Sequence, residues 1–191
     1  MKSVSVQKAA RVLNILVWIA LICNLAVLPA VPGLVYFRFA TENSITLSGL
    51  RGTFAYDVDD GLGNLLMVYL DYVWKEPYTA VFTLFLLFSG ICTALILWQA
   101  LLTLESILRG TPFSFENAHA LQKAGVLSFL ISFAALARVV FGICFYQSFR
   151  PLTTYNALFV PVFAMFGLLC LVMSALFRQA AEMKAESDLT I

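Results

Sequence analysis

Charge is scarce in this chain, and so are the side chains that most enzymes use for catalysis. Only 12% of the 191 residues are charged, about half the share found in soluble domains, whereas 61% are hydrophobic. The formal net charge is +1, which provides no basic surface for a nucleic acid. These values exclude an ordinary soluble enzyme and a nucleic-acid-binding domain, and they are typical of a protein surrounded mostly by lipid.

Histidine and cysteine are too few and too dispersed for a metal centre or a disulfide framework. The single histidine is His119. No C-x-x-C pair is present, and each cysteine lies inside an apolar run, where it acts as a small hydrophobic residue. The cysteines are Cys23, Cys92, Cys144 and Cys170.

Serine-hydrolase, zinc-protease and nucleotide-binding motifs are also lacking. Asp57, Asp59 and Asp60 do not have the spacing of a calcium loop. We expect no enzymatic activity, cofactor or metal.

The chain contains four long apolar runs, and each can cross the roughly 30 Å hydrocarbon core of a bilayer as a helix. The predicted spans are residues 12–31, 78–104, 126–146 and 157–177. The first run could instead be a cleaved signal peptide. It is longer than a signal core and has no small-residue cleavage site, so we interpret it as a retained span. The sequence therefore predicts an all-α, polytopic membrane bundle of four transmembrane helices.

The distribution of basic residues outside the spans predicts that both termini are cytoplasmic. Three segments share that side: the N-terminus, the loop between the second and third spans, and the tail 178–191. They carry Lys2, Lys8, Arg11, Arg109, Lys123, Arg178 and Lys184. The opposite side carries Arg38, Arg51, Lys75 and Arg150. The majority of positive charge thus lies on the side of the termini.

The extracytoplasmic loop, residues 32–77, is the one sizeable region outside the spans. Its apolar residues recur at helical spacing and predict a helix over residues 61–74. That helix is too apolar to stand in water, so we expect it to lie along the outer membrane interface, with a re-entrant segment as the alternative. Weak alternation over residues 44–47 and 53–58 also allows a short hairpin.

The cytoplasmic loop has the pattern of a tight connector between two helices. Glu105 and Arg109 are four residues apart, which extends the second helix by a turn, and Gly110 ends it. Ser114 can cap the next helix, and Glu116 lies in its first turn, where the helix dipole favours a carboxylate. In the alternative interpretation, the same residues also form a docking surface for a soluble partner.

Two segments resemble a known family. Residues 106–117 read SILRGTPFSFEN, and residues 177–191 read FRQAAEMKAESDLTI. The first is similar to a Gly/polar-Pro-Phe-Ser/Thr-x-Glu-Asn element that lies between two spans in the bacterial domain-of-unknown-function 2975 family. The second is similar to that family's closing signature, with alanine at Ala180 and Ala181 where relatives often have a glycine. We expect the resemblance to cover the whole four-span layout.

The resemblance implies a small multi-pass protein of the bacterial cytoplasmic (inner) membrane without an assigned enzymatic activity. Genes of this family commonly lie beside one for a small helix-turn-helix DNA-binding regulator, which implies a regulatory or sensory membrane protein that sequesters that regulator. The competing function is a small channel, exporter or immunity-type protein for a peptide or an anion. The expected partner-binding residues are Arg109, Pro112, Phe113, Glu116, Asn117, Asp188, Leu189, Thr190 and Ile191.

One charge, Arg138, lies inside a predicted span. Insertion of an arginine at this depth costs roughly 2.5–3.5 kcal/mol, so such residues often mark functional sites. The apolar cores of the other spans contain no acid. Arg138 either faces the bundle interior, snorkels to headgroups, or contacts an anion. Its candidate polar neighbours are Asn24, Ser89, Thr93, Gln99 and Gln147.

Overall fold

The computed structural model describes residues 2–35, 74–75, 77–153 and 155–189, and these residues form helices joined by short turns. The long helices are α1 (Lys2–Val27), α5 (Pro77–Leu108), α6 (Phe115–Tyr146) and α7 (Phe159–Leu189). Three 3-10 turns accompany them: η1 (Leu28–Ala30), η2 (Arg150–Thr153) and η3 (Tyr155–Leu158). The expected interfacial helix over 61–74 and the hairpin lie outside the described residues, except for Trp74.

Four helical segments are long and apolar enough to cross a membrane, which confirms the predicted architecture. The protein is therefore an all-α, multi-pass membrane protein. The observed helices are longer than the predicted spans, because α6 begins at Phe115 and α7 continues to Leu189. The first span is interrupted at η1, where Pro29 lies, and residues 31–35 are helical again.

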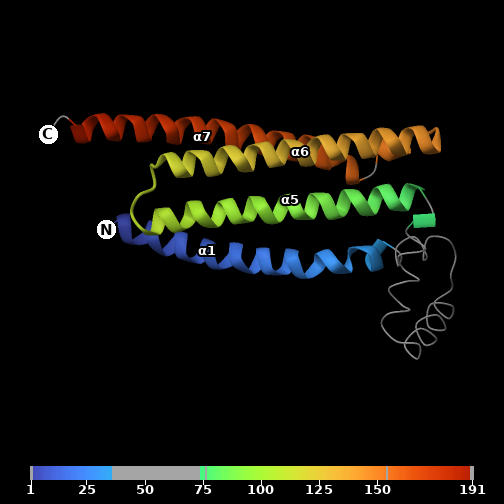
Figure 1. Ribbon diagram of the computed structural model, residues 1–191, viewed down its shortest axis with the longest axis horizontal. Helices are drawn as coiled ribbons and strands as arrows, with labels where there is room; N and C mark the ends of the chain where they lie inside the picture. Colours follow the sequence, from blue (N-terminus) through green and yellow to red (C-terminus); the bar gives the residue numbers. More distant parts are fainter. Residues whose placement is uncertain (1, 36–73, 76, 154, 190–191) are drawn as a thin grey trace, which may run out of the picture.

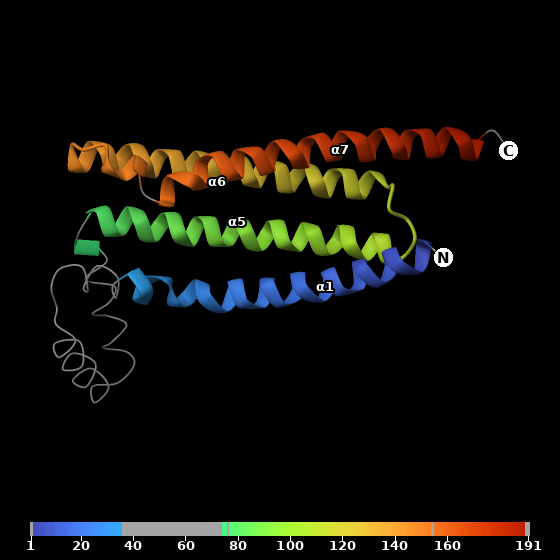
Figure 2. The same ribbon diagram turned by 180° about the vertical axis from the view of Figure 1, so that it is seen from behind.

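The helices lie antiparallel in a row, and each packs on the next one along the chain (Figures 1 and 2). Both termini lie at one end, which we call the N/C end. The end where α5 begins and α6 finishes is called the opposite end. Within the part of the chain that the structure describes, α1 packs extensively only on α5, so it forms an edge of the row.

A core shared by three helices holds the rest of the row together. It contains Cys92 and Ile96 of α5, Ala124 and Ile131 of α6, and Cys170 of α7. Phe85 of α5 also meets Phe159 of α7, with ring centroids 6.1 Å apart. Among these three helices α6 is the central one, because its residues Ser128, Ile131 and Ala135 are fully buried.

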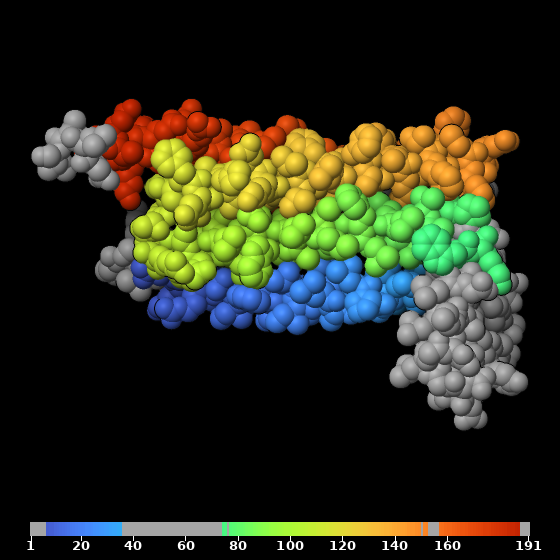
Figure 3. Space-filling view, viewed as in Figure 1, coloured from blue at the N-terminus to red at the C-terminus, as the bar shows by residue number. Residues whose placement is uncertain are grey.

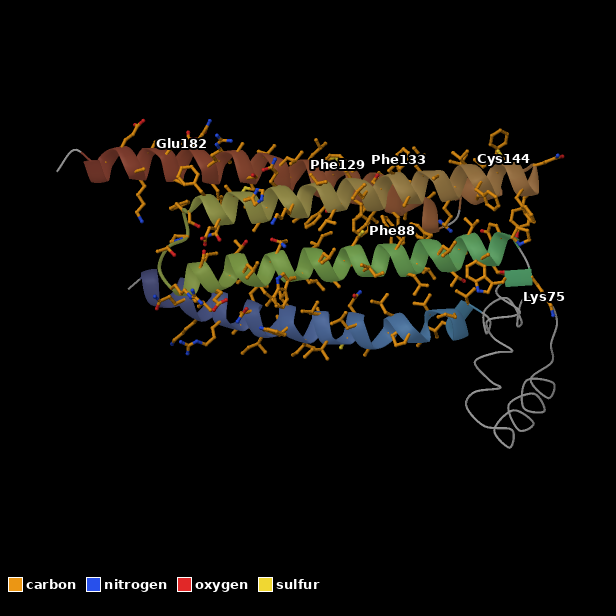
Figure 4. The ribbon with its side chains drawn as sticks, viewed as in Figure 1. Lys75, Phe88, Phe129, Phe133, Cys144 and Glu182 are labelled. Carbon is orange, nitrogen blue, oxygen red and sulfur yellow. The ribbon has the colours of Figure 1, made fainter. Side chains whose placement is uncertain are left out.

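The surface is apolar along the middle and charged at the ends. Phe133 of α6 is 71% exposed and Met165 of α7 is 68% exposed, as expected for side chains that face lipid. In Figure 4, the labelled phenylalanines Phe88, Phe129 and Phe133 lie along the middle, whereas Lys75 and Glu182 lie towards the two ends. The space-filling view shows helices packed side by side along this length (Figure 3).

Small residues bring α6 and α7 into close contact. A Cβ atom at Gly125 would lie 3.2 Å from the Gly167 carbonyl oxygen, and one at Gly167 would lie 3.1 Å from the Gly125 carbonyl oxygen. The Ser174 hydroxyl donates to the Ala118 carbonyl at 2.7 Å. Small and hydroxylated residues are typical of helix interfaces in membranes, where apolar burial does not favour protein over lipid.

The contacts between α6 and α7 fix a shift of the two helices along their axes, so that their ends do not coincide. The Ser132 hydroxyl donates to the carbonyl of Val160, the second residue of α7, at 2.8 Å. From Ser132 to Tyr146, α6 continues for 14 residues, or about 21 Å at 1.5 Å per residue. Beside this stretch the chain contains η2 and η3 instead of a regular helix. At the N/C end, α7 projects beyond the start of α6 (Figures 1 and 2).

Candidate functional site

The turn between α5 and α6, residues 109–114, is closed by local hydrogen bonds, and we call it the connector. The Thr111 N–H donates to the Ser106 carbonyl at 3.0 Å, and the Gly110 N–H donates to the Ile107 carbonyl at 3.1 Å. This pair of bonds is a Schellman motif, whose C′ residue adopts a left-handed conformation that favours glycine. Gly110 has φ +83°, as its place in the sequence predicted.

The next helix begins with the predicted cap. Ser114 has extended backbone angles, and its hydroxyl accepts from the Asn117 N–H at 3.3 Å. Glu116 lies in the first turn of α6, where a carboxylate interacts favourably with the helix dipole. The Glu105–Arg109 pair is also present at 2.5 Å, although its exposed position limits its contribution to stability.

Asn117 joins both sides of the connector. Its side chain is buried, and its amide nitrogen donates to the Ser106 hydroxyl of α5 and, at 2.7 Å, to the Pro112 carbonyl. A side chain with two donors can satisfy both acceptors simultaneously. Asn117 therefore holds α5, the connector and α6 in one arrangement, a role the sequence did not reveal because Ser106 and Pro112 lie 11 and 5 residues away.

Two aromatic side chains are exposed beside this fixed turn. Phe113 is 49% exposed and Phe115 is 54% exposed. The Phe113 ring packs on one side against Phe177 of α7, with centroids 5.6 Å apart. The connector thus contacts the α7 turn at which the predicted fourth span ends.

Grooves lie on either side of α6 at the N/C end. One, of about 450 Å³, lies between α5 and α6 beside the connector, and Arg109, Glu116 and Lys123 line it. The other, of about 380 Å³, lies between α6 and α7, where Phe115 and Arg178 contribute to its wall. His119 borders both.

The closing residues of the chain lie away from the connector. Asp188 is 11 residues beyond Phe177 on the same helix, or about 16 Å along its axis. Leu189 is the last residue of α7, whereas Thr190 and Ile191 lie outside the described residues. The structure therefore brings Arg109, Pro112, Phe113, Glu116 and Asn117 together, but it does not bring Asp188 or Leu189 to them.

Arg138 lies eight residues before the end of α6 and is only 5% exposed. Its guanidinium carbon is 4.8 Å from the ring centroid of Phe85 and 5.3 Å from that of Phe82. Its Nε is buried without a hydrogen-bond partner among the residues that the structure describes.

Two of the polar residues expected around Arg138 form hydrogen bonds within their own helix, and a third is exposed to solvent. The hydroxyls of Ser89 and Thr93 donate to carbonyls of their own helix, at 3.1 and 2.8 Å. Gln147 is exposed at the end of α6. The sequence did not identify Phe82 and Phe85 as neighbours. The two phenylalanines are three residues apart and therefore share one face of α5. This spacing is the sequence feature that could have indicated them.

Comparison with protein families gives one match, to the family described as a protein of unknown function, DUF2975, over residues 64–191. The search of curated proteins and the search of solved structures found no match to this chain. The family match includes the connector and α5, α6 and α7, but it leaves α1 outside, so it is shorter than the four-span resemblance expected from the sequence. The chain belongs to the DUF2975 family.

Proposed function

We propose that this protein is a membrane-bound regulator that holds a small helix-turn-helix DNA-binding protein at its N/C end, and that this end faces the cytoplasm. The observation that carries the proposal is the pair of exposed phenylalanines, Phe113 and Phe115, beside the connector. Both residues lie outside the spans predicted from the sequence, residues 78–104 and 126–146. An exposed aromatic side chain is unfavourable in water, and aromatic residues are common anchors in protein interfaces.

The hydrogen bonds around Asn117 support a role for the connector in recognition. A surface that is already ordered loses less conformational entropy on binding than a flexible loop does. Gly110, Ser114 and Asn117 each fix part of the turn that presents Phe113. The grooves on both sides of α6 provide concave surface for side chains of the partner.

The choice of partner depends on the family resemblance. Genes of that family commonly lie beside a gene for a helix-turn-helix regulator. Retention at the membrane would keep such a regulator from its operator without any chemical step. Release would require the connector or the adjoining turns of α7 to change their contacts with it.

The test uses the full-length protein in lipid nanodiscs and the purified helix-turn-helix protein encoded beside its gene. Interface hot spots contribute about 2 kcal/mol or more, so Phe113→Ala and Phe115→Ala should each weaken binding by roughly 30-fold. Phe149→Ala is the matched control, because Phe149 is 76% exposed at the opposite end. Absence of binding by the wild type, or equal affinity in all four proteins, would refute the proposal.

A further inference from the structure

A further groove lies at the N/C end, between α1 and α5. Its volume is about 290 Å³, and it is lined by Asn14, Trp18, Trp98, Leu101, Leu102 and Glu105. Within the described part of the chain α1 packs extensively only on α5, so the groove lies at the edge of the row of helices. Both tryptophans are accessible there, because Trp18 is 45% exposed and Trp98 is 48% exposed. A molecule in the surrounding bilayer can therefore reach this groove.

The two tryptophans indicate how deep the groove lies in the bilayer. At the opposite end, Tyr78 of α5 packs on Tyr146 of α6, with ring centroids 4.9 Å apart. From Tyr78 to Trp98, α5 continues for 20 residues, or about 30 Å, which is the thickness of the hydrocarbon core. Tyrosine and tryptophan are enriched at both membrane interfaces. Trp98, whose ring centroid is 6.4 Å from that of Trp18, therefore lies where the hydrocarbon ends and the headgroup layer begins.

The polar groups of the groove lie farther out than the tryptophans. Asn14 precedes Trp18 by four residues, or about 6 Å, and Glu105 follows Trp98 by seven residues, or about 10 Å. The headgroup layer is roughly 5–8 Å thick on each side, so Asn14 lies within it and Glu105 lies at its outer margin. Asparagine offers two N–H donors, whereas a carboxylate only accepts. Going away from the hydrocarbon, the groove thus presents aromatic rings, then a donor, then an anion.

Glu105 has room for a second donor beside its arginine partner. Its side chain is 55% exposed, and its Oε1 accepts from Arg109 at 2.5 Å. A carboxylate accepts at both oxygen atoms, and the ion pair uses Oε1 alone. Glu105 also borders the groove between α5 and α6, whereas Asn14, Trp18 and Trp98 do not. The combination of aromatic, donor and anion is therefore a property of the groove between α1 and α5.

We propose that this groove binds a phospholipid with a primary ammonium headgroup, such as phosphatidylethanolamine. The ammonium donates to the Glu105 carboxylate, the phosphate accepts from the Asn14 amide, and the glycerol packs on the tryptophans. The order of these groups in the groove matches the lipid, whose phosphate adjoins the glycerol and whose ammonium is outermost. The proposal does not depend on regulator binding at the connector, so either can fail alone.

The headgroup chemistry determines the expected selectivity. A trimethylammonium headgroup, as in phosphatidylcholine, has the same charge but no N–H to donate to Glu105. A glycerol headgroup, as in phosphatidylglycerol, has no cation. An exposed carboxylate–ammonium contact contributes up to about 1 kcal/mol. We therefore expect phosphatidylethanolamine to bind about 3- to 5-fold more tightly than either of the other two lipids.

The experiment uses the two tryptophans of the groove as reporters. The chain has three tryptophans, so the full-length protein carries Trp74→Phe, which leaves Trp18 and Trp98. It is reconstituted in phosphatidylcholine bilayers that contain one lipid with brominated acyl chains, which quench tryptophan fluorescence on contact. The brominated lipid is phosphatidylethanolamine, phosphatidylglycerol or phosphatidylcholine, with identical chains. The extent of quenching at each lipid ratio gives the relative affinity for the three headgroups.

A matched pair of variants assigns the selectivity to one carboxylate. Glu105→Gln should reduce binding of phosphatidylethanolamine to the level of phosphatidylcholine. Glu182→Gln is the control, because Glu182 is also an exposed partner of an arginine four residues away, but on α7. It should keep the wild-type preference. Unchanged fluorescence in bilayers without bromine checks that both variants fold.

Three outcomes would each overturn the proposal. The first is equal quenching by phosphatidylethanolamine and phosphatidylcholine in the Trp74→Phe protein. The second is equal or stronger binding of phosphatidylglycerol, which would assign lipid binding to nearby cations such as Arg11 and Arg109. The third is an undiminished preference in Glu105→Gln. If that variant does not fold, the ranking of the three lipids decides.

Discussion

At the scale of single residues, Asn117 shows how one side chain can fix a turn. It is buried, and it donates to the Ser106 hydroxyl and to the Pro112 carbonyl. The Pro112 carbonyl can only accept, so the residue at position 117 must be a donor. The connector geometry therefore depends on the amide group and not merely on a polar residue of similar size.

Substitution of Asn117 tests this dependence. Asn117→Ala removes the donor from two half-buried acceptors and should lower the free energy of unfolding by about 1–3 kcal/mol. Asn117→Asp should be at least as destabilising at neutral pH despite its similar shape, because a carboxylate would face the Pro112 carbonyl. Thermal unfolding in detergent provides the measurement, and Gln122→Ala, at an exposed position of α6, is the control. Wild-type stability of Asn117→Asp would contradict the assigned donor.

At the scale of helices, the crossing of α6 and α7 depends on the absence of side chains at two positions. Gly125 and Gly167 face each other's carbonyl oxygens, and Phe129 and Leu171 close the contact on either side. Backbone atoms cannot rotate away as a side chain can, so an added methyl group must push the helices apart.

Gly125→Ala and Gly167→Ala should each lower stability by roughly 1–3 kcal/mol, the usual range for overpacking a close contact. Gly33→Ala is the matched control, because a Cβ there would meet nothing within 4 Å. Alanine also favours a helix over glycine, so Gly33→Ala should be neutral or stabilising. If the three variants unfold at the same temperature, the close approach of α6 and α7 is not important for stability.

At the scale of the whole molecule, the chain consists of a three-helix unit and an edge helix. The shared core joins α5, α6 and α7, and the family match over residues 64–191 covers the same helices. Contacts such as Trp18 with Trp98, whose ring centroids are 6.4 Å apart, attach α1 to α5. Elements with fewer buried contacts open at lower free energy.

Hydrogen exchange in detergent should therefore differ between helices. We expect backbone amides of α1 to exchange faster than those of α6, which lies between two neighbours. Mass spectrometry of peptides from the two helices gives the comparison in a single sample, with equal numbers of residues chosen from their central turns. Equal protection of the two helices would show that α1 is as firmly held as the core.

The orientation of the molecule is a further prediction at this scale. Thr111→Cys and Ser187→Cys, in a background without the four native cysteines, should resist an impermeant thiol reagent in intact cells, because most positive charge lies at that end. Gln147→Cys, at the exposed end of α6, should react. Labelling of Thr111→Cys in intact cells would reverse the assignment of the N/C end to the cytoplasm.

The sequence by itself determined the four helices and the connector. Long apolar runs have few alternatives to a spanning helix, because every backbone polar group must be satisfied inside the membrane. The end of α5 shortly before Gly110 and the start of α6 directly after its cap Ser114 were equally predictable, since capping depends on residues within a few positions of each other.

Only the tertiary structure decided which faces pack. Lipid tails and protein interiors are similarly apolar, so the hydrophobic pattern cannot distinguish the exposed Phe133 from the buried Ile131. The offset of α6 and α7, the contact of Phe113 with Phe177 and the rings beneath Arg138 depend on pairs far apart in sequence. Local propensity contains no information about such pairs, because they result from the fit of complete helices against each other.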